Sequence, residues 1–305
     1  MSGGERRGAP TVVQLRAFLG IAEHLHFRDA AAGLGMSQPA LSGAIAALEE
    51  NLGTRLVERT TRRVLLTPDG ERLVGRARRV VDAMDDLVAA AREPFTGPLR
   101  LGVIPTVAPY TLPAALRVLR REHPGLELFV HEEQTAQALD GLGDGRLDLL
   151  LLALPAARAG MVELPLFEED FVLLVPEAHA LAGRRTVRAE EVPEEELLLL
   201  DEGHCLRDQA LEVCRGRAAA TRAAGLPTLV QLVAAGLGVT LLPRTSVEVE
   251  TGKGTGLRTV EFAGPRPSRT IGLVLRQGTP RSQEFHTLAQ SIRTALPTLP
   301  VRPTP

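Results

Sequence analysis

The only two cysteines of the 305-residue sequence, Cys205 and Cys214, lie nine positions apart. Cys205 directly follows His204, and Asp208 comes three positions later. A thiolate near a cation or a helix N-terminus is a strong nucleophile that oxidants attack first, and a second thiol can then close a disulfide with it. The pair could therefore carry out redox chemistry. On spacing alone, the alternative is that both cysteines are small buried hydrophobic residues.

Good helix formers fill the segment between the cysteines, after a break at Gly203. Nine helical steps would place the two residues on opposite faces of a helix, about 13 Å apart along its axis. A disulfide requires Cα atoms within about 7 Å of each other. If the reduced segment is helical, oxidation must therefore unwind or rebuild it, and disulfide formation becomes a conformational event.

Length and composition predict two or three domains with real cores, since 44% of the 305 residues are hydrophobic. The net charge of −2 gives no global nucleic-acid signature, but residues 53–81 hold eight arginines against three acids, a local balance of +5. Residues 1–10 have no apolar core, and no apolar run approaches the roughly 18 residues that span a bilayer. We expect a cytoplasmic protein in which any disulfide is transient. The sequence predicts no cofactor and no metal site.

The N-terminal region has the helix caps and turn residues that are typical of a helix-turn-helix. One apolar helical stripe consists of Leu15, Phe18, Leu19 and Ala22. A second short helix is predicted over 27–34, with a turn at Gly35 and a third helix that Ser37 caps and Gly53 closes. By periodicity alone, a plain three-helix bundle is an equally good interpretation.

A single long helix is predicted from residue 68 to about 92. Its apolar positions recur every three or four residues, at Leu73, Ala77, Val80, Met84, Leu87 and Ala91. A domain of about sixty residues cannot bury a seam of that length, so we expect it to pack on a second copy as a coiled coil. Residues 94–98 are the expected hinge.

From residue 99 onward, strand and helix patterns alternate, which predicts an α/β region with a largely parallel sheet. The predicted strands are 99–103, 126–132, 147–152, 171–175, 197–200, 239–242, 257–262 and 270–275. The predicted helices cover 109–121 and 281–296 and also begin at 135, after 205 and after 227.

Several strings resemble the LysR-type transcriptional regulators. Residues 27–70 are similar to the winged helix-turn-helix of that family, and the resemblance extends over nearly the whole chain. Four stretches resemble its peroxide-sensing branch: GHCLRDQA with the second cysteine, IPTVAPY at 104–110, HEEQT at 131–135 and RTIGLV at 269–274.

The resemblance implies an all-α winged helix-turn-helix DNA-binding domain (1–67), a dimerising linker helix (68–93), a hinge (94–98) and a regulatory domain (99–305). The regulatory domain is expected to be α/β, two-lobed and like the periplasmic binding proteins. Lobe I would hold about 99–167 and 269–296, and lobe II about 168–268, with crossovers near Phe167 and Ser268.

The resemblance also implies how the chain meets promoter DNA. Gln38 and Ser42 would face base edges from the recognition helix, Pro39 would fix the start of that helix, and Ser37 would cap it or touch phosphate. The expected wing contacts are Arg59, Arg62 and Arg63. A dimer or tetramer would bind a site with approximate two-fold symmetry, and RNA polymerase is an expected partner.

At the cysteines, the resemblance implies that Cys205 attacks hydrogen peroxide and that Cys214 resolves the product into a reversible disulfide. Thr106 and Thr135 would hydrogen-bond the peroxide. The expected aids to the chemistry are His204 beside the thiol, Asp208 in a proton relay and Arg269 as the thiolate partner, with Arg207 a weaker candidate. Thioredoxin or glutaredoxin would restore the thiols. The chain would then be a transcription factor, oxidised once per switch, and not an enzyme.

Two other functions stay open at this stage. One is a LysR-type regulator of a small metabolite with idle cysteines, and the other is a thiol peroxidase that also binds DNA. Residues 224–227 read Ala-Gly-Leu-Pro where the family usually has Ser or Thr at the start of its effector-pocket helix. This departure argues against an ordinary carboxylate inducer.

Overall fold

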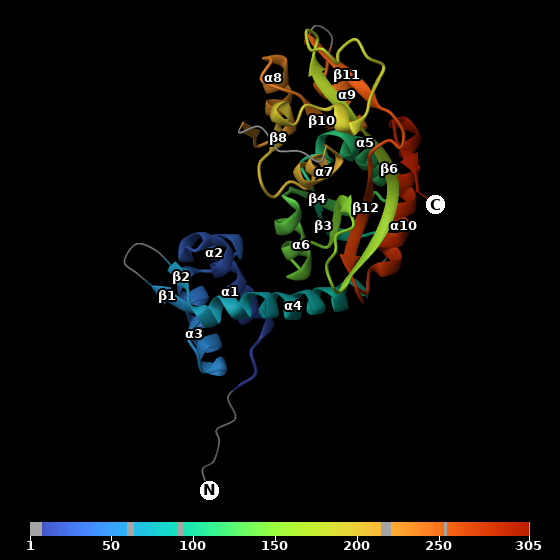
Figure 1. Cartoon of the computed structure of the whole chain (residues 1–305). Helices are drawn as coiled ribbons and strands as arrows, with labels where there is room; N and C mark the ends of the chain where they lie inside the picture. The colour runs from blue at the N-terminus through green and yellow to red at the C-terminus, as the bar shows by residue number, and fades with distance from the viewer. Residues whose placement is uncertain (1–7, 60–63, 91–93, 215–220, 253–254, 305) are drawn as a thin grey trace. The chain divides into compact units, whose positions relative to one another are not determined.

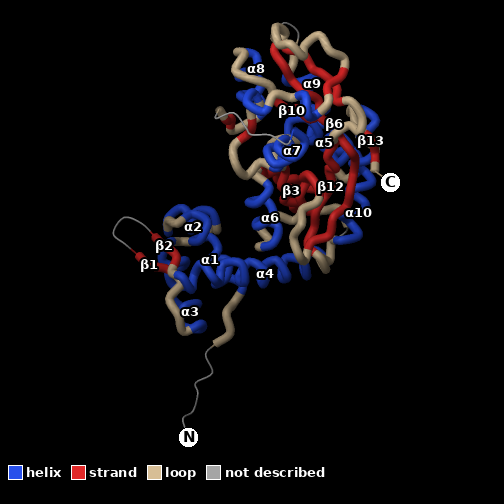
Figure 2. The backbone as a smooth tube through the Cα atoms, viewed as in Figure 1, coloured by secondary structure: helices blue, strands red, loops and turns tan. Residues whose placement is uncertain are grey.

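The structure is a computed structural model that describes residues 8–59, 64–90, 94–214, 221–252 and 255–304. The chain forms two compact units, one of Met1–Glu93 with Gly143–Arg146 and one of the remaining residues. Each is described by itself (Figures 1 and 2). In the described ranges, no helix is both long and apolar enough to cross a membrane.

Three helices form the start of the first unit, as predicted: α1 (Val12–His24), α2 (Phe27–Gly33) and α3 (Gln38–Leu52). Their apolar stripes meet in one core that contains Phe18, Ile21, Leu41, Ile45 and Leu48. The hairpin of β1 (Val57–Arg59) and β2 (Val64–Leu66) follows. The helices and this two-stranded wing are thus the regular elements that the described residues of the N-terminal region form up to Leu66.

The long helix α4 (Pro68–Ala90) begins where the sequence predicts, and the predicted last turn at Ala91 and Arg92 lies outside the described residues. One side of α4 is buried against the core of the unit through Ala77 and Val81. Four larger apolar side chains of α4 are exposed: Val80, Met84, Leu87 and Val88. Among the described residues, these side chains form an exposed apolar seam on α4.

The second unit is built on a nine-stranded sheet. Its strands are β3 (Gly97–Val103), β4 (Leu126–Glu132), β5 (Leu149–Leu154), β6 (Met161–Pro176), β7 (Thr186–Val187), β10 (Thr240–Pro243), β11 (Leu257–Phe262), β12 (Ser268–Arg276) and β13 (Arg302–Pro303). The main order is β4-β3-β5-β12-β6-β11-β7, and β10 and β13 also pair with β6. A separate parallel pair joins β8 (Leu199–Leu200) to β9 (Arg222–Ala223).

The prediction of a largely parallel sheet was wrong. β3 pairs in parallel with β4 and β5, but β12 runs antiparallel to both β5 and β6, and β10, β11 and β13 run antiparallel to β6. The physical reason is that the chain leaves one lobe along β6 and returns along β12, so these neighbours must point in opposite directions. β3 also starts at Gly97, inside the expected hinge.

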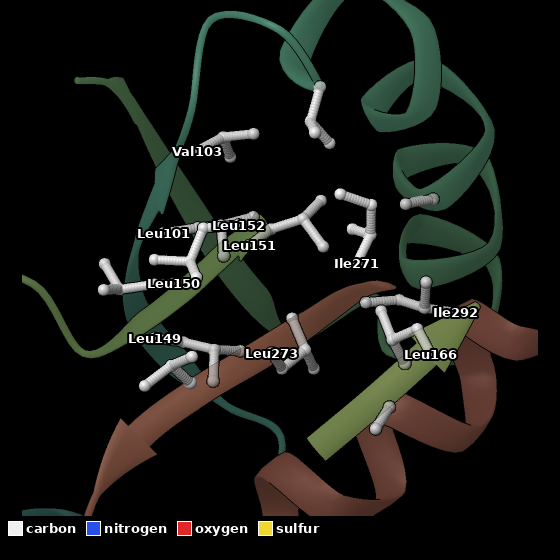
Figure 3. Packing of buried hydrophobic residues seen from close by; sticks show 14 of the residues in the cluster. Leu101, Val103, Leu149, Leu150, Leu151, Leu152, Leu166, Ile271, Leu273 and Ile292 are labelled. Carbon is white, nitrogen blue, oxygen red and sulfur yellow. The ribbon is translucent and has the colours of Figure 1, made fainter. Parts of the chain in front are cut away.

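Two hydrophobic cores, which we call the first-lobe core and the second-lobe core, lie along this sheet. The first-lobe core contains Leu101, Leu149–Leu152, Leu166, Ile271 and Leu273 (Figure 3). Helices α5 (Ala108–Glu122) and α10 (Ser282–Arg293) pack together beside it. The second-lobe core contains Phe171–Val175, Leu197–Leu200 and Phe262, with side chains from α7 (Cys205–Cys214) and α8 (Leu226–Ala234).

Strand β6 connects the two cores without a break, although only its second half was predicted. Phe167 belongs to the first-lobe core and Phe171 to the second-lobe core, so the chain passes between lobes at residues 168–170. The C-terminal strand β13 pairs with β6 at this passage. Arg302 there contacts Glu168 at 3.2 Å and Asp170 at 2.6 Å.

Candidate functional site

Helix α7 carries both cysteines, one at each end, which confirms the predicted helix between them. Both thiols are free. The helix has ten residues, so its geometry separates the two Cα atoms by about 13 Å along the axis and turns the side chains to opposite faces. In this conformation no disulfide can join them.

Cys205 lies at the first position of α7, half-buried against the first-lobe core. The chain enters the helix through Gly203, whose φ of +93° is a left-handed conformation. A Cβ atom at Gly203 would lie 2.3 Å from Oε1 of Gln134, so a side chain there would have to displace the Gln134 amide. The amide of Gln134 donates to the carbonyl of Glu202 at 3.4 Å. The start of α7 is thus held close to the residues that precede α6 (Thr135–Gly143).

Cys214 lies in a different environment, with 3% exposure inside the second-lobe core. Burial raises the pKa of its thiol to about 12. At neutral pH this residue is therefore a protonated thiol. The two sulfurs belong to the cores of different lobes.

Arg269 is fully buried and makes a compact set of polar contacts. Its Nε donates to Oε2 of Glu169 at 2.9 Å, Nη1 donates to Oγ1 of Thr106 at 3.0 Å, and Nη2 donates to the Thr106 carbonyl at 3.0 Å. Its guanidinium carbon also lies 5.8 Å from the Phe171 ring centroid. The predicted residues Arg269 and Thr106 are brought together. Among the hydrogen bonds of the described residues, none links either of them to the Cys205 sulfur.

Glu169 and Thr245 complete this network, and sequence reasoning missed both. Oε1 of Glu169 accepts from the backbone N–H of Thr245 at 2.9 Å and from the Thr245 hydroxyl. Glu169 is 1% exposed. The available signal was a run of three acids between two apolar segments, but the sequence does not show which of the three is buried with a partner. Thr245 gave no such signal.

Thr135 begins α6, and its hydroxyl is buried without a hydrogen-bond partner in the described part of the chain. Oε1 of Gln209 on α7 is in the same condition. A buried polar group without a partner costs about 1–3 kcal/mol unless water or a ligand satisfies it. Both atoms can therefore form a hydrogen bond with a small polar ligand.

The remaining predicted residues near Cys205 lie at the start of α7, where the Arg207 amide donates to the His204 carbonyl at 3.0 Å. His204 is 5% exposed. Asp208 is exposed in the first turn of α7. Arg207 donates to the Leu200 carbonyl at 3.2 Å. No cluster of three or more metal-ligand residues occurs in the described ranges.

The predicted DNA-contacting residues lie at one end of α3 and on the wing. Ser37 caps α3 by accepting from the Ala40 amide at 3.3 Å. Gln38 and Pro39 are exposed, and Ser42 is half-buried. Arg59 ends β1, while Arg62 and Arg63 lie outside the described residues.

Comparison with known proteins agrees with this architecture. Residues 12–71 match the bacterial regulatory helix-turn-helix of the LysR family, and residues 92–297 match the LysR substrate binding domain. A probable hydrogen peroxide-inducible genes activator of Streptomyces viridosporus is 60% identical over 98% of both chains.

Solved structures give the same result. The chain is similar to full-length OxyR of Pseudomonas aeruginosa, a cysteine mutant, with a TM-score of 0.82, 34% identity and coverage of 94% and 95% of the two chains. It is also similar to a peroxide-bound cysteine mutant of Corynebacterium glutamicum OxyR, with a TM-score of 0.67, 41% identity and coverage of 96% and 94%. The chain therefore belongs to the LysR family of DNA-binding transcriptional regulators and is of the OxyR type, the hydrogen peroxide-sensing transcriptional activators.

Proposed function

We propose that this regulator senses hydrogen peroxide through a reversible disulfide between Cys205 and Cys214, and that the disulfide changes its action at antioxidant genes. The observation that carries the proposal is the placement of two free thiols at opposite ends of one helix, each packed in the core of a different lobe. Joining them cannot leave α7 intact. A chemical event at Cys205 thereby becomes a structural event.

In the first step, the Cys205 thiolate attacks one peroxide oxygen and the O–O bond breaks. The departing hydroxide takes a proton and leaves as water, while Cys205 becomes a sulfenic acid. Thr106 is a suitable donor because its oxygen already accepts from Arg269, which leaves its own hydrogen for a ligand. The unpartnered hydroxyl of Thr135 offers a second contact. We assign His204 and Arg269 to the thiolate and Asp208 to proton delivery.

In the second step, Cys214 leaves the second-lobe core and attacks the sulfenic sulfur, which forms the disulfide and releases water. In total, two thiols and one peroxide give one disulfide and two waters. A thiol with a pKa of about 12 is a poor nucleophile, so α7 must open before Cys214 can react. Thioredoxin or glutaredoxin would return the two electrons. Each switch consumes one peroxide, unlike the turnover of a peroxidase.

Oligomerisation would carry the change to DNA. The exposed seam of α4 adjoins an apolar groove of about 290 Å³ that runs between α1, α3 and α4. The groove is lined by Leu15, Phe18, Leu48, Leu52, Leu56, Leu73, Ala77 and Val80, with Pro10 and Arg76. We propose that α4 is the dimerising linker between a DNA-binding domain (1–67) and a two-lobed regulatory domain (99–305). A dimer or tetramer would then act on promoter DNA and RNA polymerase in the bacterial cytoplasm.

The DNA-contacting residues are proposals of the same kind. We assign Gln38 and Ser42 to base edges, Ser37 and Pro39 to the start of α3, and Arg59, Arg62 and Arg63 to phosphate or the minor groove. The exposure of Gln38 and Pro39 supports the first two assignments.

Mass spectrometry of the peroxide-treated protein, combined with promoter footprinting in both redox states, tests the proposal. We expect an intramolecular Cys205–Cys214 link and a peroxide-dependent footprint that Cys205→Ser abolishes. Cys214→Ser is the matched control, which should stop at the sulfenic acid. A footprint that responds to peroxide while both thiols stay free would refute the mechanism. Sustained thioredoxin-coupled turnover would instead favour a peroxidase.

A further inference from the structure

One buried carboxylate between the lobes accepts hydrogen bonds from a guanidinium, a backbone N–H and a hydroxyl. Glu169 lies on β6 at the passage between the two cores, and Arg269 lies opposite it on β12. The two side chains are 1% and 0% exposed, and Nη2 of Arg269 is 2.8 Å from Oε2 of Glu169. Nε of Arg269 contacts the same oxygen at 2.9 Å, and Thr245 supplies an N–H and a hydroxyl to Oε1.

A guanidinium, a backbone N–H and a hydroxyl that converge in a dry place are the groups that would hold a carboxylate arriving from solution. Here each of them already has an internal carboxylate as its acceptor. Other groups on Arg269 are engaged by Thr106. The Nε edge of Arg269 and both donors of Thr245 are therefore already engaged, and a second anion would face the charge of Glu169 at close range.

The neighbouring acids on β6 do not share this role. Successive side chains of a strand point to opposite faces, so Glu168 and Asp170 face away from Glu169. Both instead contact Arg302 of the C-terminal strand, with Glu168 about half exposed. The strand thus offers a built-in comparison between a buried acid with interlobe contacts and an adjacent surface acid.

We propose that Glu169 occupies, from within the chain, the position that an organic acid would take between the lobes, and that it reserves this region for an uncharged ligand. The inference rests on the proposed peroxide-sensing function, since hydrogen peroxide is neutral at physiological pH. By binding the Nε edge of Arg269, Glu169 also orients the Nη groups toward Thr106. Glu169 is in this sense a residue that determines specificity and positions Arg269.

Removing the carboxylate and offering a small one in its place tests the proposal. Glu169→Ala in the reduced full-length protein leaves a buried, unpaired guanidinium beside a vacated space. We expect its Tm to fall by on the order of 10 °C, because breaking a buried pair on one side is strongly destabilising. Sodium formate or acetate at about 100 mM should restore several degrees in a saturable way, compared with sodium chloride at equal ionic strength.

Three controls run under the same conditions. The unsubstituted protein and Glu168→Ala should gain no more from formate than from chloride. Glu169→Gln fills the space with an uncharged isostere, so it should lose stability without any response to formate. If Glu169→Ala does not accumulate in folded form, its refolding yield is compared in formate and in chloride, and recovery only in formate supports the proposal.

The inference is overturned if formate stabilises Glu169→Ala no more than chloride does, or if it acts equally on the unsubstituted protein. An equal refolding yield in both salts has the same meaning. The measurement uses no peroxide, and it can be repeated with Cys205 and Cys214 both replaced by serine. Failure of the redox mechanism and failure of the carboxylate proposal are therefore distinguishable.

Discussion

The two ends of α7 are made of the same kind of residue in opposite surroundings. At the first end, Cys205 is half-buried, follows a left-handed glycine and packs on the first-lobe core. At the other end, Cys214 is enclosed in the second-lobe core, and its pKa is raised to about 12. In the proposed mechanism this difference has a role: an oxidant would react with Cys205 first, and Cys214 would react only after the helix opens.

The largest effect, on sulfenic acid formation, is expected from replacing Cys205. Cys205→Ser should abolish sulfenic acid formation, because Cys214 has a thiolate fraction about 10³-fold below that of an ordinary thiol with a pKa of 9.0. Trapping of sulfenic acid with dimedone, followed by mass spectrometry, measures this loss. Cys214→Ser is the control that should keep full trapping at Cys205. Equal trapping at both cysteines in the unsubstituted protein would show that the two thiols do not differ in reactivity.

The raised pKa of Cys214 should make the stability of the protein depend on pH in alkaline solution. The folded pKa of Cys214 lies above the unfolded value, so folding favours the protonated thiol. The resulting stability is complete below about pH 9 and is lost between about pH 9 and pH 12, at up to about 1.4 kcal/mol per pH unit.

Urea unfolding of the reduced protein against Cys214→Val isolates this effect. The comparison is needed because Tyr110 also has a raised pKa, through burial and its bond to Glu250. As pH rises through this window, the free energy of unfolding of the unsubstituted protein should fall relative to that of Cys214→Val. A constant difference would mean that the thiol is not protected.

A side chain at Gly203, in the turn before Cys205, should destabilise the protein. Gly203→Ala must place a Cβ atom at a φ of +93° and displace Gln134, so we expect a loss of about 1–2 kcal/mol or more. Gly278→Ala is the matched control, because it has a φ of +78° with open space around the position. Urea unfolding compares them, and a larger loss at Gly203 measures the contact beyond the backbone strain. Equal losses would show that the contact with Gln134 is unimportant.

The smallest effect concerns the charges at the two ends of α7. Asp208→Asn removes an acid from the first turn and should cost about 0.3–1 kcal/mol, whereas Glu212→Gln near the last turn should be neutral or slightly stabilising. Because Asp208 is exposed, water can replace much of its proton delivery, and we expect oxidation to slow by less than about tenfold. Stopped-flow oxidation of both variants checks this. Equal rates for both variants would remove Asp208 from the relay.

The local elements were predictable because their signals are local. The helix between the cysteines, the three N-terminal helices and strands such as β4 and β11 follow from periodicity, caps and breaks within about fifteen residues of sequence. The cysteine pair was visible for the same reason. Its residues are nine positions apart.

The sheet direction and the buried acid were not predictable in this way. The first half of β6 was missed because charged residues 168–170 interrupt its apolar run and suggest a loop. Glu169 depends on partners 76 and 100 positions away, at Thr245 and Arg269. No pattern within one segment identifies such partners, since only the fold brings them together.

The pairing of β6 with β12 and β13 also sets an order of assembly on the ribosome. The strands of the second-lobe core run consecutively from the later part of β6 to β11, so that lobe can fold while synthesis continues. The first lobe must wait for β12, α10 and β13, which follow the second lobe in the chain. A nascent chain that stops before β12 would thus carry a folded second lobe beside an incomplete first lobe.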